Sequence, residues 1–415
     1  MKQNHRKQLS VLFLSLALLG GCAANNISTA EPNKETSAVT EENTAKEEVT
    51  QSVTGETYTA TEADESAIDV SGNETLSLSN VTVEKMSGDA TSANDASFKG
   101  VNSAVRVYDN ATLTITGSTI TADAENATGV FAYDNGTITI SDSTITVTGG
   151  GAGGVQVAGG GTLYGNNLTV TSSSKAAIRS DRGGGIMVID GGTYTSLGKN
   201  GCPAIYSTAD ITVSNATLTS ENSRAVIIEG KNSVTLDNCI LSGNDQSTKE
   251  GSVKANVLLY QSASGDAENG TSSFTMTNGS MTSLSGAMFY CTNTASVITL
   301  ENTELNLTED NILLIVSEGR WGKDGSNGGT CEMNVSDQAL SGDITVDAIS
   351  SLDLTLTNCD YTGAILSEGE TTLTLSENST WTLTADSYLT EINGDLTQIK
   401  FNGFTLYING TPVTQ

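Results

Sequence analysis

Apolar and polar residues alternate along most of the chain in short runs that favour strands over helices. Residues 104–121 read AVRVYDNATLTITGSTIT, and residues 129–146 read GVFAYDNGTITISDSTIT, with Val, Leu or Ile at alternate positions. Side chains on a strand point in turn to its two faces, so this pattern predicts strands with one buried and one exposed face. The second segment begins 25 residues after the first, which indicates a repeat.

The repeat continues through most of the chain. A small residue followed by an alternating strand recurs at intervals of 21 to 31 residues, within the period expected of solenoids. Each unit holds a second strand and usually a third, as in TLTITGSTIT and DITVSNATLTS. The recurring first strands begin at residues 104, 129, 154, 177, 204, 225, 256, 287 and 311.

One position between the second and third strands is almost always Asn, Asp or Gly. These residues tolerate left-handed backbone angles, and stacked Asn side chains can hydrogen-bond along a ladder. We therefore expect a tight corner at the same place in every unit. The eleven corner positions are Asn80, Gly117, Asp142, Asn167, Gly191, Asn215, Asn238, Asn278, Asn302, Asp337 and Asn358.

Three short strands in each unit of about 25 residues predict an all-β chain wound as a parallel β-helix. The sequence resembles the right-handed parallel β-helix superfamily, the pectate-lyase-like fold, and within it the adhesin-like surface lipoproteins of bacteria. This resemblance implies a right-handed solenoid of roughly twelve coils, about 55–60 Å long at about 4.8 Å per coil. We expect the helix over residues 66–415, with an irregular first coil within 68–103 and a cap with hairpin character over about 384–415.

The N-terminus has the layout of a bacterial lipoprotein signal. A basic start, the apolar run LSVLFLSLALL and the sequence LGGC follow one another, which predicts a signal peptide over residues 1–21 and lipidation of Cys22. Residues 22–65 are rich in Thr, Ser and Glu, and we expect them to be a disordered tether. The predicted location is therefore extracytoplasmic, at the cell surface, with a lipid anchor in the membrane.

Composition narrows the possible functions. The formal net charge of -29 argues against nucleic acid as a partner, because binding phosphates requires a basic surface. The only histidine is His5, inside the predicted signal, so histidine-based catalytic and metal sites are excluded from the rest of the chain. Five cysteines follow Cys22, and their spacings match no zinc or redox motif. We expect most of them to be buried, and Cys291 with Cys331 is the pair to test first for a disulfide.

Alternation along the first strands predicts a stripe of outward side chains. In AVRVYD, Val105 and Val107 should face inward, so Arg106 and Tyr108 should face outward. Aromatic rings with Arg and Gln between them suit sugar rings or an extended peptide. The alternative is that loops of variable length cover this face. The expected ligand-binding residues are Arg106, Tyr108, Phe131, Tyr133, Gln156, Arg179 and Tyr206, with Trp321 on the Gly-rich insertion 317–330, and the stripe is expected to continue through Ile227, Leu258, Phe289 and Leu313.

Three functions remain open. The first is a non-enzymatic, adhesin-like surface protein that binds extracellular polysaccharide or a host or neighbouring surface protein, with no cofactor. The second is a calcium-dependent polysaccharide lyase, as the resembling superfamily implies, with Arg179 in the cluster KAAIRSDRGGG and with Asp109 and Asp134 as calcium ligands in adjacent coils. The third is a purely structural spacer.

Overall fold

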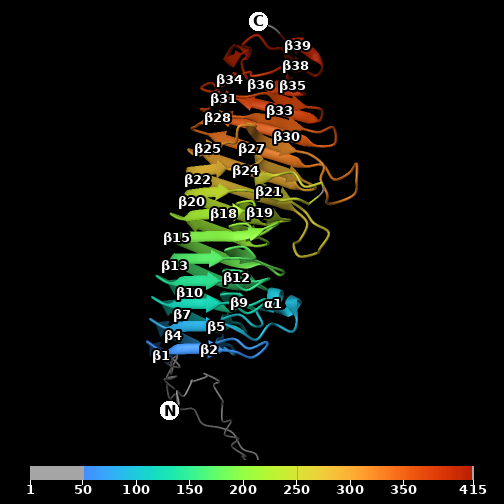
Figure 1. Cartoon of the computed structure of the whole chain (residues 1–415). Helices are drawn as coiled ribbons and strands as arrows, with labels where there is room; N and C mark the ends of the chain where they lie inside the picture. The colour runs from blue at the N-terminus through green and yellow to red at the C-terminus, as the bar shows by residue number, and fades with distance from the viewer. Residues whose placement is uncertain (1–50, 250, 414–415) are drawn as a thin grey trace, which may run out of the picture.

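A computed structural model describes residues 51–249 and 251–413, which form a rod of stacked β-coils. Figure 1 shows the coils rising from the N-terminal to the C-terminal end, with strands of successive coils side by side. Almost all strand pairs are parallel, so the all-β parallel β-helix expected from the repeat is confirmed. The predicted signal peptide, Cys22 and residues 22–50 of the predicted tether lie outside the described residues.

One wall of the rod is a 12-stranded parallel sheet, to which each coil contributes one strand. Its strands begin with the small residue and alternating run recognised in the sequence. In order they are β3 (Ile68–Val70), β6 (Val105–Val107), β9 (Val130–Tyr133), β12 (Val155–Ala158), β14 (Ile178–Ser180), β16 (Ile205–Ser207), β19 (Val226–Glu229), β21 (Ala255–Tyr260), β23 (Ala287–Thr292), β26 (Ile312–Val316), β29 (Asp343–Val346) and β32 (Ile365–Ser367).

Most of the second and third strands of the coils form a 20-stranded sheet that bends around the rest of the rod. Long strands such as β13 pair with two strands of the preceding coil, β10 and β11. Such a strand runs through the corner, so it belongs to both sides of the bent sheet. The strands are β1 (Gln51–Thr54), β2 (Thr57–Ala60), β4 (Thr75–Ser79), β5 (Thr82–Lys85), β7 (Thr112–Thr116), β8 (Thr119–Ala122), β10 (Thr137–Ser141), β11 (Thr144–Val147), β13 (Gly161–Ser172), β15 (Gly185–Lys199), β17 (Asp210–Ser214), β18 (Thr217–Asn222), β20 (Ser233–Gly243), β22 (Thr271–Ser283), β24 (Ala295–Glu301), β25 (Glu304–Asn306), β27 (Thr330–Ser336), β30 (Ser351–Thr357), β33 (Glu370–Leu375) and β36 (Glu391–Asn393).

Two smaller sheets complete the C-terminal end. One contains β28 (Ala339–Ser341), β31 (Asp360–Thr362), β34 (Thr380–Thr382) and β37 (Ile399–Lys400), and the other contains β35 (Ser387–Leu389), β38 (Leu406–Ile408) and β39 (Thr411–Val413). The pair of β38 and β39 is antiparallel, whereas β35 and β38 are parallel. Parallel pairing therefore continues well into the segment expected to be a cap, and only the final hairpin leaves the coil pattern.

The first coil begins earlier than predicted. Strands β1 and β2 pair in parallel with β4 and β5, although both lie within the segment expected to be a tether. The coil closes on buried Tyr58 and Ala60, which alternate with threonines in TYTA. The boundary at residue 66 is thus wrong, because the polar outward residues of this coil hid two inward apolar positions.

Stacked aliphatic side chains fill the interior of the rod. Val105, Val130 and Val155 lie in register on adjacent coils and are fully buried. Burying such a side chain stabilises the fold by roughly 1.5–3 kcal/mol, so each coil is held mainly by the inward residues of its neighbours.

The predicted corner is confirmed at all eleven positions. Their φ angles lie between 49° at Asn167 and 71° at Gly191, in the left-handed region. Side-chain amides link successive corners, as where Asn238 Nδ2 donates to Asn215 Oδ1 at 2.8 Å and Asn302 Nδ2 donates to Asn278 Oδ1 at 2.8 Å. Asn and Asp therefore have two roles at these corners. They adopt the left-handed φ angle, and their side chains form hydrogen bonds with the adjacent coil.

Candidate binding face on the outer side of the 12-stranded sheet

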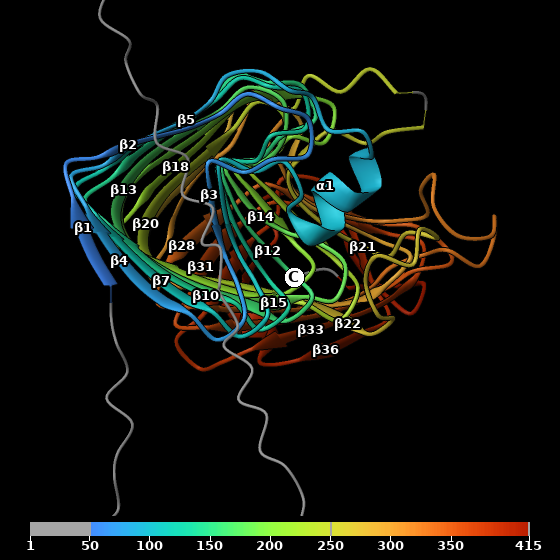
Figure 2. The same cartoon turned by 90° about the horizontal axis from the view of Figure 1, so that it is seen from below.

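The helix α1 (Ala93–Lys99) and the long loops lie outside the same wall of the rod, the 12-stranded sheet (Figure 2). The loops are residues 261–270 and 317–329, together with the segment that precedes β21. Sites on repeat proteins commonly use such insertions, so this outer face is the candidate functional region. No helix in the described part of the chain has the length and hydrophobicity needed to cross a bilayer.

The outward residues of this sheet are in the predicted register over its first half. Arg106 pairs with Phe131, Phe131 with Gln156, and Gln156 with Arg179. Arg179 then pairs with Tyr206, Tyr206 with Ile227, and Ile227 with Leu258. The repeat thus brings the residues of the predicted stripe onto one face.

Beyond Leu258 the predicted register is wrong, by one residue at Phe289 and by two at Leu313. Leu258 pairs with Tyr290, and Tyr290 pairs with Ile315. Phe289 and Leu313 instead face the interior and belong to the main core. At Phe289 a slip of one residue exchanges the two faces of the strand, so Tyr290 is outward instead. At Leu313 the register shifts between Ile312 and Leu314, and Ile315 is the outward residue.

Helix α1 is a short helix with a capping residue at each end. The side chain of Ser92 accepts a hydrogen bond from Asp95 N, and Gly100 ends the helix at a φ of 69°. Lys99 and Asp95 form an ion pair of 2.8 Å one turn apart. These are standard helix-boundary signals, and they occur within the segment that was expected to be an irregular coil.

This helix covers the first half of the stripe. Arg106 Nε donates to Lys99 O at 2.8 Å, and Gln156 Nε2 donates to Ser97 O at 2.9 Å. Phe131 and Gln156 are both 0% exposed. A methyl group at Gly100 would lie 2.6 Å from the Phe131 ring, which shows how closely the end of the helix packs on it. The expectation that Phe131 and Gln156 form an open ligand surface is therefore wrong.

A buried charged cluster lies under the same helix. Arg179 Nη2 is 2.8 Å from Asp181 Oδ2, and Lys175 Nζ donates to Ser97 Oγ at 2.8 Å. Burial lowers the pKa of Lys175 to about 8, with Arg179 contributing in the same direction and Asp181 opposing it. Arg179 also lies over the Tyr206 ring, 4.5 Å from its centroid. Helix α1 thus packs over the cluster that contains Arg179, whereas the two predicted calcium ligands, Asp109 and Asp134, are exposed.

A second polar network surrounds the carboxyl group of Glu229, which is 1% exposed. Tyr206 Oη donates to Glu229 Oε2 at 2.6 Å, and Tyr260 Oη donates to the same oxygen at 2.8 Å. Ser262 donates to the other oxygen from the loop 261–270. Burial raises the pKa of Tyr206 well above its ordinary value, with further contributions from Tyr260 and Glu229. Both tyrosines therefore remain hydroxyl donors that hold the loop against the sheet.

Trp321 lies on the neighbouring loop and packs on Tyr260, with ring centroids 4.4 Å apart. The loop is held at its base, where Tyr290 Oη donates to Glu318 O at 3.0 Å. Trp321 belongs to an outer hydrophobic cluster that is separate from the main core and also contains Tyr206, Tyr260, Tyr290 and Ile315. Trp321 is half-buried, so one part of it packs and another part faces solvent.

The other predicted ligand residues are half-buried or exposed. Arg106 covers Tyr108, with the guanidinium carbon 3.9 Å from the ring centroid, and Tyr133 lies in the next coil. Asp109 and Asp134 are exposed at left-handed turns of adjacent coils. Within residues 51–249 and 251–413 no group of three or more potential metal-ligating side chains is found, so these two aspartates have no third ligand of that kind.

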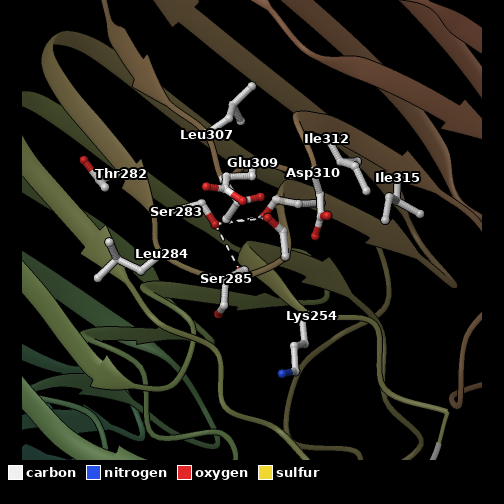
Figure 3. Close-up of a pocket in the computed structure, with 13 residues that line it drawn as sticks. Lys254, Thr282, Ser283, Leu284, Ser285, Leu307, Glu309, Asp310, Ile312 and Ile315 are labelled. Atoms are coloured by element: carbon white, nitrogen blue, oxygen red, sulfur yellow. Dashed lines mark hydrogen bonds between the residues drawn. The ribbon is translucent and has the colours of Figure 1, made fainter.

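A groove that the sequence analysis did not predict lies further along this face (Figure 3). It encloses about 820 Å³ between the turn 282–287, the turn 307–312 of the next coil, and Lys254 of the preceding coil. Leu284, Leu307, Ile312 and Ile315 supply its apolar surface, and Leu284 is 61% exposed. A single exposed Leu in a serine-rich turn, SLSG, is the only signal that could have indicated it.

The rim of the groove carries unpaired charges. Lys254, Glu309 and Asp310 line it and are exposed. None of the three belongs to an ion pair among the described residues. These groups are thus free to contact a ligand that lies against the aliphatic floor.

A buried ion pair fixes the wall that carries Lys254. Arg224 Nε is 3.1 Å from Asp245 Oδ2, and Arg224 Nη2 donates to Val253 O at 2.6 Å. Asp245 also accepts a hydrogen bond from Ser247 N at 2.9 Å. Since both charged groups are almost fully buried, this ion pair holds Val253 in place just before β21.

No protein-family model, no curated protein and no solved structure matches this chain. The candidate face therefore rests on its own geometry.

Proposed function

We propose that this chain is a non-enzymatic, adhesin-like surface protein that binds a partner protein in the groove beside the 12-stranded sheet. The observation that carries the proposal is the groove itself, with an aliphatic floor and unpaired charges on its rim. Aliphatic floors with charged rims suit an extended protein segment, in which apolar and charged side chains alternate. The proposed occupant is an extended segment with an aliphatic residue beside a Lys or Arg.

Charge supports a basic segment. Glu309 and Asp310 lie together on one wall of the groove, and the chain as a whole has a formal charge of -29. Such a field attracts a basic partner and speeds its association. Thr308, a half-buried residue in the lining of the groove, has a buried oxygen, Oγ1, that lacks a hydrogen-bond partner in the described structure.

The test uses an array of extended peptides that alternate aliphatic and basic residues, followed by affinity measurement in solution on the best binder. Leu284→Ser should weaken binding about 10- to 100-fold, because a buried leucine contributes roughly 1.5–3 kcal/mol. The matched control is Ile240→Ser, since Ile240 is 56% exposed but lies outside the groove. Equal affinities of the wild type and both variants would overturn the proposal.

Glycan binding is the second candidate, and Trp321 favours it. This ring is partly exposed, and Arg320 lies over it at 4.8 Å, an arrangement of planar groups that suits a sugar. A glycan array run with the wild type and Trp321→Ala separates the two candidates. Glycan binding that is lost in Trp321→Ala but retained in Leu284→Ser would place function on the loop rather than in the groove.

Within this proposal the protein belongs to the pectate-lyase-like superfamily and is held at the cell surface by lipid on Cys22. The order of basic residues, apolar run and LGGC supports the anchor. The full chain should partition into the detergent phase after cloud-point extraction from bacterial cells, and Cys22→Ser should move it to the aqueous phase. A wild-type chain found in the aqueous phase would remove the anchor without affecting the groove.

A further inference from the structure

Two cysteines from adjacent coils meet inside the rod at the base of the loop 317–329. Cys291 is the penultimate residue of the strand β23, and Cys331 is the second residue of β27, which follows the loop. Their Sγ atoms are 3.7 Å apart, and both residues are at most 1% exposed. The chain between them contains β24, β25, β26 and the whole loop, and Cys291 pairs with Val316, the residue directly before the loop.

The other described cysteines lack this arrangement. Cys202, Cys239 and Cys359 each direct the thiol at a backbone carbonyl, at 2.7 Å from Ser174 O, 3.4 Å from Val213 O and 3.3 Å from Val335 O respectively. All five are reduced in this structure. Only the Cys291 and Cys331 pair therefore has a sulfur partner within reach among the described residues.

We propose that Cys291 and Cys331 are a cross-linking site that becomes a disulfide when the chain folds in an oxidising compartment. Two thiols lose two protons and two electrons as the S–S bond forms, and an oxidised disulfide such as glutathione disulfide accepts the electrons and becomes two thiols. The bond would close the chain around the loop that carries Trp321. It does not depend on what binds in the groove.

The bond should form during folding rather than afterwards. The contact with Cys291 and burial raise the pKa of the Cys331 thiol well above its ordinary value, and thiolate is the reactive species in disulfide exchange. Both thiols are also screened from solvent by the completed coils. A refolding experiment is therefore the appropriate assay.

The disulfide bond can be detected by cutting the loop with a protease. A recognition sequence for a sequence-specific protease is inserted after Gly325, where the backbone is exposed and no atom lies within 4 Å of an added Cβ. The full chain is unfolded in reductant, refolded with reduced and oxidised glutathione, cut, and run on denaturing gels. We expect one band without reductant and two fragments with it. Two fragments without reductant would overturn the proposal.

Two variants and one count complete the test. Cys291→Ser should give two fragments under both conditions, whereas Cys239→Ser, which removes another fully buried thiol, should behave as the wild type. If Cys291→Ser does not fold, alkylation of the uncut wild type decides the question. Five cysteines follow Cys22, so a disulfide leaves three of these five alkylated after unfolding without reductant, with Cys291 and Cys331 unmodified in peptide maps. Alkylation of all five would show that the pair is only core packing.

Discussion

The outer face of the 12-stranded sheet is covered in two different ways. Over its first half, helix α1 packs on Phe131 and bonds to Arg106 and Gln156 through backbone carbonyl groups. Over its second half, loops cover Tyr206 and Tyr260 and then leave an open groove next to Ile315. The same repeat of strands therefore carries both a covered and an accessible surface. The inserted helix and loops determine which part of the outer face is covered.

The strongest test of this contrast is Phe131→Ala. If α1 buries this ring as described, the change should cost about 3–5 kcal/mol, as for other buried aromatic residues. Thermal or denaturant unfolding of the wild type and the variant measures the loss. The matched change Tyr133→Ala, at a half-buried ring in the same strand, should cost clearly less. Equal small losses would mean that α1 does not cover the stripe in solution.

Lys175 should make the α1 region sensitive to pH. Its pKa is lowered from 10.5 to about 8 in the folded chain, so the unfolded chain binds more protons between these values. Stability should therefore rise as pH increases from about 8 to about 10.5, by about 3 kcal/mol for the 2.5-unit shift. The variant Lys175→Met should lack this rise. Unfolding midpoints of both proteins at about pH 7 and about pH 10 give the difference, and Lys199→Met at an exposed site is the control.

Removing one donor from Glu229 should have a smaller effect in the loop-covered half. Tyr206→Phe deletes the hydroxyl group that donates to Glu229 and leaves the ring in place. The expected cost is about 1–3 kcal/mol, as for other buried acceptors that lose a donor. Hydrogen exchange should become faster in the loop 261–270 and stay unchanged in α1. Tyr164→Phe, at a ring that is 45% exposed on another wall, should have no measurable effect on either.

The smallest effect on stability is expected in the groove. Leu284→Ser changes a side chain that is 61% exposed, so the unfolding midpoint should stay within the range of ordinary surface substitutions, about 0.5 kcal/mol. A large loss of stability would show that Leu284 packs against the fold and that the groove is closed in solution.

The coil and its corners could be predicted from sequence because they depend on local rules. Alternation fixes which residues face inward, and left-handed angles select Asn, Asp or Gly, as at Asn215 and Gly191. Each coil then repeats its neighbour. The same rules placed Arg106, Phe131 and Gln156 on one face in the correct order.

What sequence reasoning missed depends on contacts between distant segments. Ser92 and Gly100 mark the ends of α1, but nothing local shows that this helix folds back over Phe131. The slip at Phe289 arose because the loop 261–270 hid the true offset between β21 and β23. The groove lies between turns of neighbouring coils, so no single stretch of sequence contains it.

Because the coils stack in parallel, the coil in which a residue lies determines its distance along the axis of the rod. Each coil adds about 4.8 Å to the length of the rod, so the position of an insertion in the sequence determines its distance from the N-terminal end. Adding or deleting one regular coil before β19 would translate the groove by that step without rebuilding it. A change in the number of coils would thus change the distance of the groove from the N-terminal end without changing the residues that line the groove.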